Sequence, residues 1–154
     1  MTFCIIFSVS FILLLAYIVS KRKLHLFEIL FIWMVIIIIH NNFLTITAIN
    51  LRMFDFAETP NNYWSLVLMR MLLIPLLIIW YLDHTLSPEW YTKWVWLPIG
   101  ILLLVGIENM GQVLNVYKAT RWKFWWSFIE WFVILVLVIY PCSWFRNLLR
   151  SELK

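Results

Sequence analysis

Three charged side chains lie deep inside long apolar segments of this sequence. Arg70, Glu108 and Glu130 are flanked on both sides by apolar residues, and His40 lies in a further apolar segment. Charges inside a membrane span are rare and usually face the bundle interior, where they pair or form a site. The candidate intramembrane polar cluster consists of His40, Arg70, Glu108, Gln112, Asn115 and Glu130.

One segment carries a stripe of polar and small residues. Glu108, Gly111, Gln112 and Asn115 follow the i, i+3, i+4, i+7 spacing of a single helix face. Small residues allow close approach of helices, and polar residues form hydrogen bonds between them. The pattern predicts that this helix is the central, buried helix of the fold.

The composition predicts an integral membrane protein. Of 154 residues, 64% are hydrophobic and 13% are charged, whereas a soluble domain has about 25% charged residues. A soluble fold of this length could not bury so much apolar surface. The net charge of +4 comes mainly from basic residues at segment ends, which favours lipid headgroups as partners and not nucleic acid.

Five segments are long enough to cross a bilayer, at about 20 residues each. The predicted fold class is all-α, a polytopic transmembrane helix bundle of about five spans in one domain over 1–154. The predicted spans are 2–20, 24–50, 64–82, 94–117 and 124–145. We expect an interruption at His40-Asn41-Asn42, a turn at Thr59-Pro60-Asn61-Asn62 and a kink at Pro75.

The basic residues predict an orientation for the chain. With the N-terminus outside and the C-terminus inside, seven Lys and Arg lie inside and four outside, as the positive-inside rule requires. The inside set is Lys21, Arg22, Lys23, Lys93, Arg146, Arg150 and Lys154, and the outside set is Arg52, Lys118, Arg121 and Lys123. The basic linker 118–123 opposes this orientation, so a re-entrant helix is the alternative.

The four ionisable side chains are predicted to lie at one depth. In this topology His40, Arg70, Glu108 and Glu130 all lie roughly 9–15 Å inward from the outer face, at 1.5 Å per residue. A central Arg costs roughly 2.5–3.5 kcal/mol on insertion, which neighbouring Leu, Ile and Val residues roughly offset. We therefore expect Arg70 to have a partner.

Two interpretations of this cluster stay open. In one, Arg70 forms an ion pair with Glu108 or Glu130, and the amide side chains are packing contacts between helices. In the other, the carboxylate that is left over forms a proton relay or ligand site with His40, open to the outer face. The second interpretation stays open because the single arginine can pair with only one of the two glutamates. The unpaired, buried carboxyl group of the other could exchange protons.

No catalytic residue, metal site or cofactor is predicted. The sequence has no H-E-x-x-H, G-x-S-x-G or Gly-rich phosphate-binding motif. His25 with Glu28 fits a solvated interfacial pair, and Asp83 and His84 with Glu89 fit a polar loop. Cys4 and Cys142 are interpreted as small hydrophobic residues.

The last third of the chain carries a set of spaced polar and aromatic residues. They are Glu108, Gly111, Tyr117, Arg121-Trp122, Trp126-Ser127-Phe128 and Trp144-Phe145-Arg146. Together with the basic residues Lys21-Arg22-Lys23 that end the first apolar segment, they resemble a family of small, functionally uncharacterised multi-span membrane proteins from spore-forming Gram-positive bacteria. The resemblance covers about half of the chain. It implies several spans and a bacterial cell membrane location, and it assigns no catalytic residue.

The sequence supports three functional hypotheses in descending order. The first is a subunit or accessory protein that acts through contacts within the lipid bilayer, with a membrane-protein partner or as a homo-oligomer. The second is a small transporter or proton-coupled carrier that uses Arg70, Glu108, Glu130 and His40. A membrane-embedded enzyme ranks last.

Overall fold

The computed structural model describes residues 1–21, 23–56, 59–85 and 90–152, so that Arg22, Glu89 and Lys154 lie outside the described residues. Five helices are long and apolar enough to cross a membrane. They are Thr2–Val19, Leu26–Asn50, Pro60–Thr85, Trp96–Val113 and Phe124–Leu149. The predicted fold class is confirmed: the chain is a helical, polytopic membrane protein.

Two of the spans contain wide, π-helical turns, and two short strands join the loops at one end. The helices are α1 (Thr2–Val19), α2 (Leu26–Leu44), α3 (Pro60–Leu68), α4 (Ile74–Thr85), α5 (Trp90–Val113) and α6 (Phe124–Glu152). The wide turns η1 (Thr45–Asn50) and η2 (Met69–Leu73) continue α2 and connect α3 to α4. The strands β1 (Phe54–Phe56) and β2 (Tyr117–Ala119) pair antiparallel.

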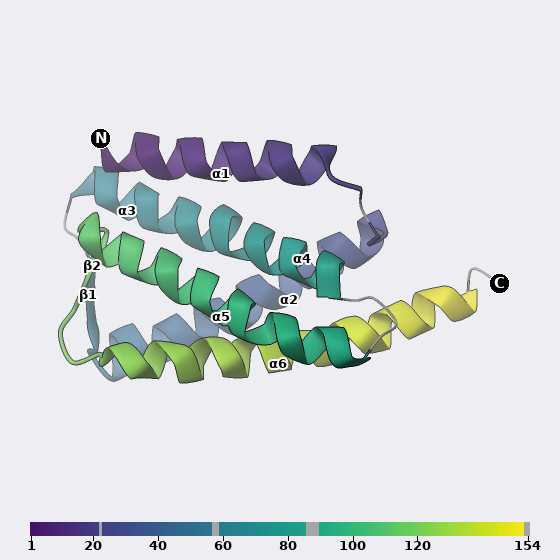
Figure 1. The fold of residues 1–154 in the computed structure, drawn as a ribbon. Helices are drawn as coiled ribbons and strands as arrows, with labels where there is room; N and C mark the ends of the chain where they lie inside the picture. Colours follow the sequence, from purple (N-terminus) through teal and green to yellow (C-terminus); the bar gives the residue numbers. More distant parts are fainter. Residues whose placement is uncertain (22, 57–58, 86–89, 153–154) are drawn as a thin grey trace.

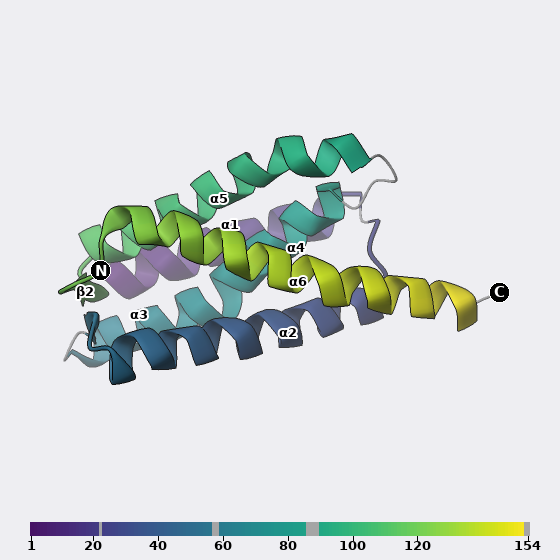
Figure 2. The same cartoon turned by 90° about the horizontal axis from the view of Figure 1, so that it is seen from below.

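The helices form a ring of four with a fifth helix outside it. Helix α2 packs against α4 and α6, and α5 packs against the same two helices. Helix α1 packs on α3, η2 and α4 at one side of the bundle, as Figures 1 and 2 show. The paired strands β1 and β2 form a short two-stranded β-ribbon, which we call the ribbon. The ribbon and the N-terminus lie at one end of the bundle, which we call the ribbon end, and the C-terminus lies at the other.

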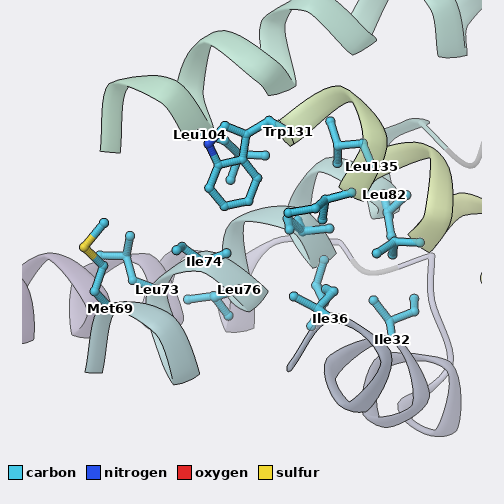
Figure 3. Close-up of a cluster of buried hydrophobic side chains, with 14 of the residues drawn as sticks. Ile32, Ile36, Met69, Leu73, Ile74, Leu76, Leu82, Leu104, Trp131 and Leu135 are labelled. Atoms are coloured by element: carbon cyan, nitrogen blue, oxygen red, sulfur yellow. The ribbon is translucent and has the colours of Figure 1, made fainter. Parts of the chain in front are cut away.

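The third span, and not the fourth, is the most buried. In the third span 56% of the residues in the most apolar stretch are buried, against 39% in the fourth. The prediction of a central fourth helix is therefore wrong. The physical reason is that α3, η2 and α4 contact α1, α2 and α5, and their apolar side chains fill the bundle interior (Figure 3).

Several predicted helix ends also change. The expected turn at Thr59-Pro60-Asn61-Asn62 is wrong, because Thr59 is the N-cap of α3 and Pro60 occupies its first turn, where its missing N–H costs nothing. The fourth span ends at Val113 instead of Tyr117, and α6 continues to Glu152, so that Arg146 lies on the helix. The second helix continues through His40-Asn41-Asn42 without a break and widens only at η1.

The irregularity in the third span is compensated by a tryptophan. Pro75 has no N–H, so in a regular helix the carbonyl of Met71 would be left without a donor. The wide turn η2 comes directly before Ile74-Pro75, and the Trp33 indole of α2 donates to the Met71 carbonyl at 3.1 Å. An interhelical hydrogen bond thus satisfies a backbone group at the site of the expected kink.

At the end of the bundle opposite the ribbon, the acidic side chains of Asp83 and Glu28 are more buried than the sequence predicted. Asp83 lies on α4, not in a loop, and its Oδ1 accepts hydrogen bonds from the backbone N–H groups of Lys23 and Leu24, both at 2.8 Å. Glu28 is buried, accepts from the N–H of His25 at 2.7 Å and lies 3.6 Å from Arg146. Neither acidic group is the solvated residue that the sequence predicted.

Gly111 allows α5 to approach the ribbon closely. A Cβ there would lie 2.9 Å from the Tyr117 ring and 3.2 Å from the Met69 side chain, whereas a Cβ at Gly106 would meet nothing within 4 Å. We expect Gly111→Ala to lower the free energy of unfolding by about 1–3 kcal/mol through overpacking. Gly106→Ala is the matched control and should leave stability unchanged or raise it by up to about 1 kcal/mol. Unfolding of both variants in mixed micelles measures the difference, and equal stabilities would contradict the packing argument.

Candidate functional site

A small cavity lies inside the bundle near the ribbon end. Four of the six residues of the predicted cluster line it: His40, Arg70, Glu108 and Glu130. They come from α2, η2, α5 and α6, so that four different spans contribute one ionisable side chain each. The remaining lining residues are Leu44, Phe54, Phe56, Leu66, Met69, Ile74, Tyr117 and Trp131. The space open to water is about 30 Å³, which is room for one or two water molecules.

The ribbon covers this cavity. Phe54 pairs with Ala119 and Phe56 with Tyr117, so that the loops after the second and fourth spans are joined by backbone hydrogen bonds. Phe54, Phe56 and Tyr117 line the cavity from this side. The Tyr117 hydroxyl donates to the backbone carbonyl of Glu108 at 2.9 Å. Burial raises the pKa of Tyr117, and the nearby carboxylates of Glu108 and Glu130 raise it further, so the phenol stays neutral and keeps donating.

His40 is enclosed without a hydrogen-bond partner for either ring nitrogen. It is 4% exposed, and neither Nδ1 nor Nε2 has a hydrogen-bond partner among the residues that the structure describes. Its ring stacks on the Trp131 indole with centroids 5.3 Å apart and planes 22° apart. Buried polar groups are normally bonded, and this ring lies beside a cavity that has room for water. An unpaired histidine at this place indicates a site that accepts a ligand, a water molecule or a proton.

Arg70 has an amide partner and not an acidic one. Its guanidinium donates to Oδ1 of Asn41 on α2, while its Nε has no partner within the described part of the chain. Among the described residues, no ion pair forms between Arg70 and Glu108 or Glu130. The expected partner is thus present, but it is an uncharged side chain that links η2 to α2. The ion-pair interpretation of the cluster is not what the structure shows.

Glu108 is bonded by neutral donors from α6. Its Oε1 accepts from the Ser127 hydroxyl at 2.9 Å and its Oε2 from the Trp131 indole at 3.0 Å. Trp122 in turn donates to the Ser127 hydroxyl oxygen at 2.8 Å. This network fixes both oxygens of Glu108 between α5 and α6. The side chain therefore has a structural role that is complete without Arg70.

Glu130 is the acidic group that is left over. It is 7% exposed, and in the part of the chain that the structure describes it forms no hydrogen bond or ion pair. Glu130 lines the cavity on one side and an open groove between the second span and α6 on the other. A buried carboxylate without a cation or donors is costly, so this position calls for a proton or an external cation.

The other two members of the predicted cluster lie outside the cavity. Gln112 is half-buried near the end of α5 and approaches the Tyr117 hydroxyl. Asn115 lies beyond the helix in the left-handed region with φ of 54°, and its backbone carbonyl accepts from Asn62 at 3.0 Å. The stripe therefore ends before Asn115, because the chain turns there toward β2.

The bundle interior beyond the cavity is apolar. Ile36, Ile74 and Leu135 lie one helical turn farther from the ribbon end than His40, Arg70 and Trp131, respectively. All three apolar side chains are only 0–2% exposed. Figure 3 shows Ile36, Ile74 and Leu135 within this packed cluster. Buried apolar side chains therefore lie next to the polar cavity on the side away from the ribbon.

The cavity brings together an imidazole, a guanidinium and two carboxyl groups, which are side chains that can exchange protons or attract ions. Within the described ranges, no three His, Cys, Asp or Glu side chains form a group that could hold a metal ion. The sequence indicated neither Asn41 as the partner of Arg70 nor Ser127 and Trp131 as donors to Glu108. Ser127 and Trp131 lie four residues apart on the same face of α6 as Glu130. This spacing indicates donors for Glu108 only once α5 and α6 are known to lie side by side.

Comparisons with protein-family models, with curated proteins and with solved structures give no match to this chain.

Proposed function

We propose that this membrane protein is a small proton-coupled carrier whose cavity binds and releases a proton. One observation carries the proposal: four spans each place an ionisable side chain at one cavity, and within the described part of the chain neither the His40 ring nitrogens nor the Glu130 carboxyl group has a hydrogen-bond or ion-pair partner. Such groups inside a bilayer mark proton relays and substrate paths. The charge distribution of the sequence supports an orientation with the ribbon end outside.

The surrounding elements support a site that can change its shape. Arg70 lies within the wide turn η2, and η1 begins directly after Leu44 at the cavity wall. Wide turns of this kind occur preferentially at functional sites. We infer that straightening or shifting these turns opens the cavity, since the apolar layer below it must part before a substrate can pass. We further propose a bacterial cell membrane as the location, on the basis of the resemblance to small, uncharacterised multi-span membrane proteins from spore-forming Gram-positive bacteria.

Proton movement tests this proposal directly. In proteoliposomes with an imposed pH gradient, the wild-type protein should carry protons faster than empty vesicles, measured with a lumenal pH dye. Glu130→Gln should reduce this rate about tenfold, since it removes the exchangeable proton. Asp55→Asn, on the exposed surface of the ribbon, is the matched control and should keep the wild-type rate.

Infrared spectroscopy separates loss of the proton site from loss of the fold. The spectrum of the folded wild-type protein should contain the band of a buried, protonated carboxyl group, and Glu130→Gln should abolish it. If correctly inserted wild-type protein moves no protons, or if Glu130→Gln and Glu108→Gln both keep the full rate, the carrier proposal is wrong.

A second candidate is a subunit that acts through contacts within the membrane. The buried apolar side chains of Ile36, Ile74 and Leu135 next to the cavity favour it, because a carrier would have to part them before a substrate could pass. On this proposal the protein would assemble with a second copy or another membrane protein. Native mass measurement from mild detergent, combined with the proton assay, distinguishes the candidates: a defined oligomer that moves no protons supports the subunit, and proton movement by a monomer or dimer supports the carrier.

A further inference from the structure

An apolar groove runs along the outside of the bundle next to the cavity. Its walls are the end of the second span with its following loop and the first turns of α6, and its volume is about 380 Å³. Pockets that hold organic molecules measure about 300–1,000 Å³. The surface of the groove is entirely apolar, so Glu130 contributes only apolar atoms to it. A hydrocarbon chain therefore fills this groove without leaving a polar group unpaired.

The groove extends from the membrane interface into the hydrocarbon layer. Trp122, Trp125 and Trp126 line it near the ribbon, and indole rings favour the headgroup level of a bilayer. Trp126 fixes the wall by packing edge to face on the other two rings. Val133 lines the far end, and the helix rises by about 12 Å between Trp125 and Val133, at 1.5 Å per residue. A chain in the groove would lie along α6, with its headgroup beside the ribbon.

Three basic residues adjoin the headgroup end of the groove. Arg52 lies between two groove residues of the loop after the second span, and Arg121 and Lys123 flank a groove residue before α6. The backbone N–H of Arg121 donates to the carbonyl of Met53 at 3.4 Å, which joins the two segments. All three basic side chains are exposed, and none forms an ion pair among the described residues.

These positive charges are not balanced locally. Asp55, the acidic residue of β1, lies opposite Lys118 in the ribbon register. The first turn of α6 carries no acidic residue, so the positive end of the helix dipole adds to the charge of the three basic residues. In the predicted orientation the basic linker 118–123 opposes the positive-inside rule. A negatively charged partner at this place gives the linker a different reason to be basic.

We propose that the groove and the three basic residues bind an anionic phospholipid, with an acyl chain along α6 and the headgroup phosphate at Arg52, Arg121 and Lys123. Basic residues next to a span attract anionic lipids, and each contributes about fivefold in affinity. A second copy of the chain in the groove would bring the same excess of positive charge, so a lipid is the better fit. This site goes beyond the proposed function and does not depend on it, because no proton transfer is involved.

Two phospholipids with identical chains and different headgroups provide the test. In native mass spectra of the full-length protein from mild detergent, dioleoylphosphatidylglycerol should bind about tenfold or more tightly than dioleoylphosphatidylcholine. Arg121→Gln/Lys123→Gln should weaken phosphatidylglycerol binding about 25-fold, fivefold for each charge. Arg52→Asn should weaken it about fivefold, since asparagine tolerates the left-handed backbone at this position. Lys21→Gln/Lys23→Gln, at the opposite end, is the charge-matched control and should bind as the wild type does.

A groove-filling variant separates a lipid in the groove from a headgroup on a basic surface. Ile129 is 53% exposed and lines the groove. Ile129→Trp should weaken phosphatidylglycerol binding about threefold or more with all basic residues in place, because the chain loses its packing contacts on α6. Leu137→Trp, at an exposed position of the same helix outside the groove, is the control and should not change binding.

The outcomes decide the inference independently of the carrier proposal. Selective binding of phosphatidylglycerol that falls in the basic-residue and groove-filling variants supports it. Equal binding of the two lipids, no binding of either, or an equal loss in Lys21→Gln/Lys23→Gln overturns it. If soluble glycerol phosphate binds as tightly as the lipid, or if Ile129→Trp binds as the wild type does, the groove takes no part and the inference is wrong. Circular dichroism checks the fold of each variant, and Arg52→Asn carries the charge test if the double variant does not fold.

Discussion

Glu108→Ala is expected to lower the free energy of unfolding by about 3–5 kcal/mol. The carboxyl group accepts from Ser127 and Trp131 inside the bundle, and each bond to a charged acceptor contributes about 1.5–3 kcal/mol. Truncation leaves both donors buried without a partner. It also removes the atoms that hold α5 to α6. Unfolding of purified protein in mixed micelles, followed by circular dichroism, measures the loss.

A graded substitution identifies the cause. Glu108→Gln keeps one oxygen that can accept from the Trp131 indole, while its amide group can donate to the Ser127 oxygen. We expect a loss of about 1 kcal/mol for this variant. If Gln and Ala at position 108 destabilise the protein equally, the negative charge of Glu108 matters and the hydrogen-bond network does not. If neither destabilises it, the structural role assigned to Glu108 is wrong.

The second large effect is expected at the opposite end of the bundle. Asp83 is 1% exposed, and its Oδ1 accepts from the backbone N–H groups of both Lys23 and Leu24. Asp83→Ala should therefore lower the free energy of unfolding by about 2–4 kcal/mol, since the connection between α1 and α2 loses its attachment to α4. Proteolysis between the first two spans should accelerate with it.

Asp83→Asn is the matched variant. Both hydrogen bonds reach the same oxygen, and the asparagine Oδ1 can occupy that place, so we expect a loss of about 1 kcal/mol or less. The exposed neighbour His84 serves as a further control, and His84→Ala should have little effect. An Asp83→Asn variant as unstable as Asp83→Ala would show that the charge of Asp83, and not the geometry of its acceptor, stabilises the connection.

The membrane fold could be predicted because it depends on properties that are local in sequence. Segment length and hydropathy define a span without knowledge of its neighbours, and the five predicted segments match five helices in the structure. The common depth of His40, Arg70, Glu108 and Glu130 followed from counting residues along helices. These four side chains line one cavity in the structure.

What the sequence could not show depends on contacts between segments. The partner of Arg70 is Asn41 because η2 adds a residue to the turn and lies against α2, and no local pattern around Arg70 indicates such a turn. The most buried helix is the third because α1 covers it from outside the ring. A charged residue at the end of a segment predicts a solvated connector for Asp83, whereas its backbone partners lie 59 and 60 residues away in the chain.

The paired strands also set an order for assembly in the membrane. Strand β1 follows the second span, but β2 becomes available only after the fourth span has been synthesised. Glu108 obtains its donors later still, since Ser127 and Trp131 belong to the last helix. Since membrane spans insert first and pack afterwards, the first four spans enter the bilayer before α6 can complete the lining of the cavity. The last helix then supplies both donors of Glu108, so a chain that stops before α6 should leave this carboxyl group without those hydrogen bonds inside the bundle.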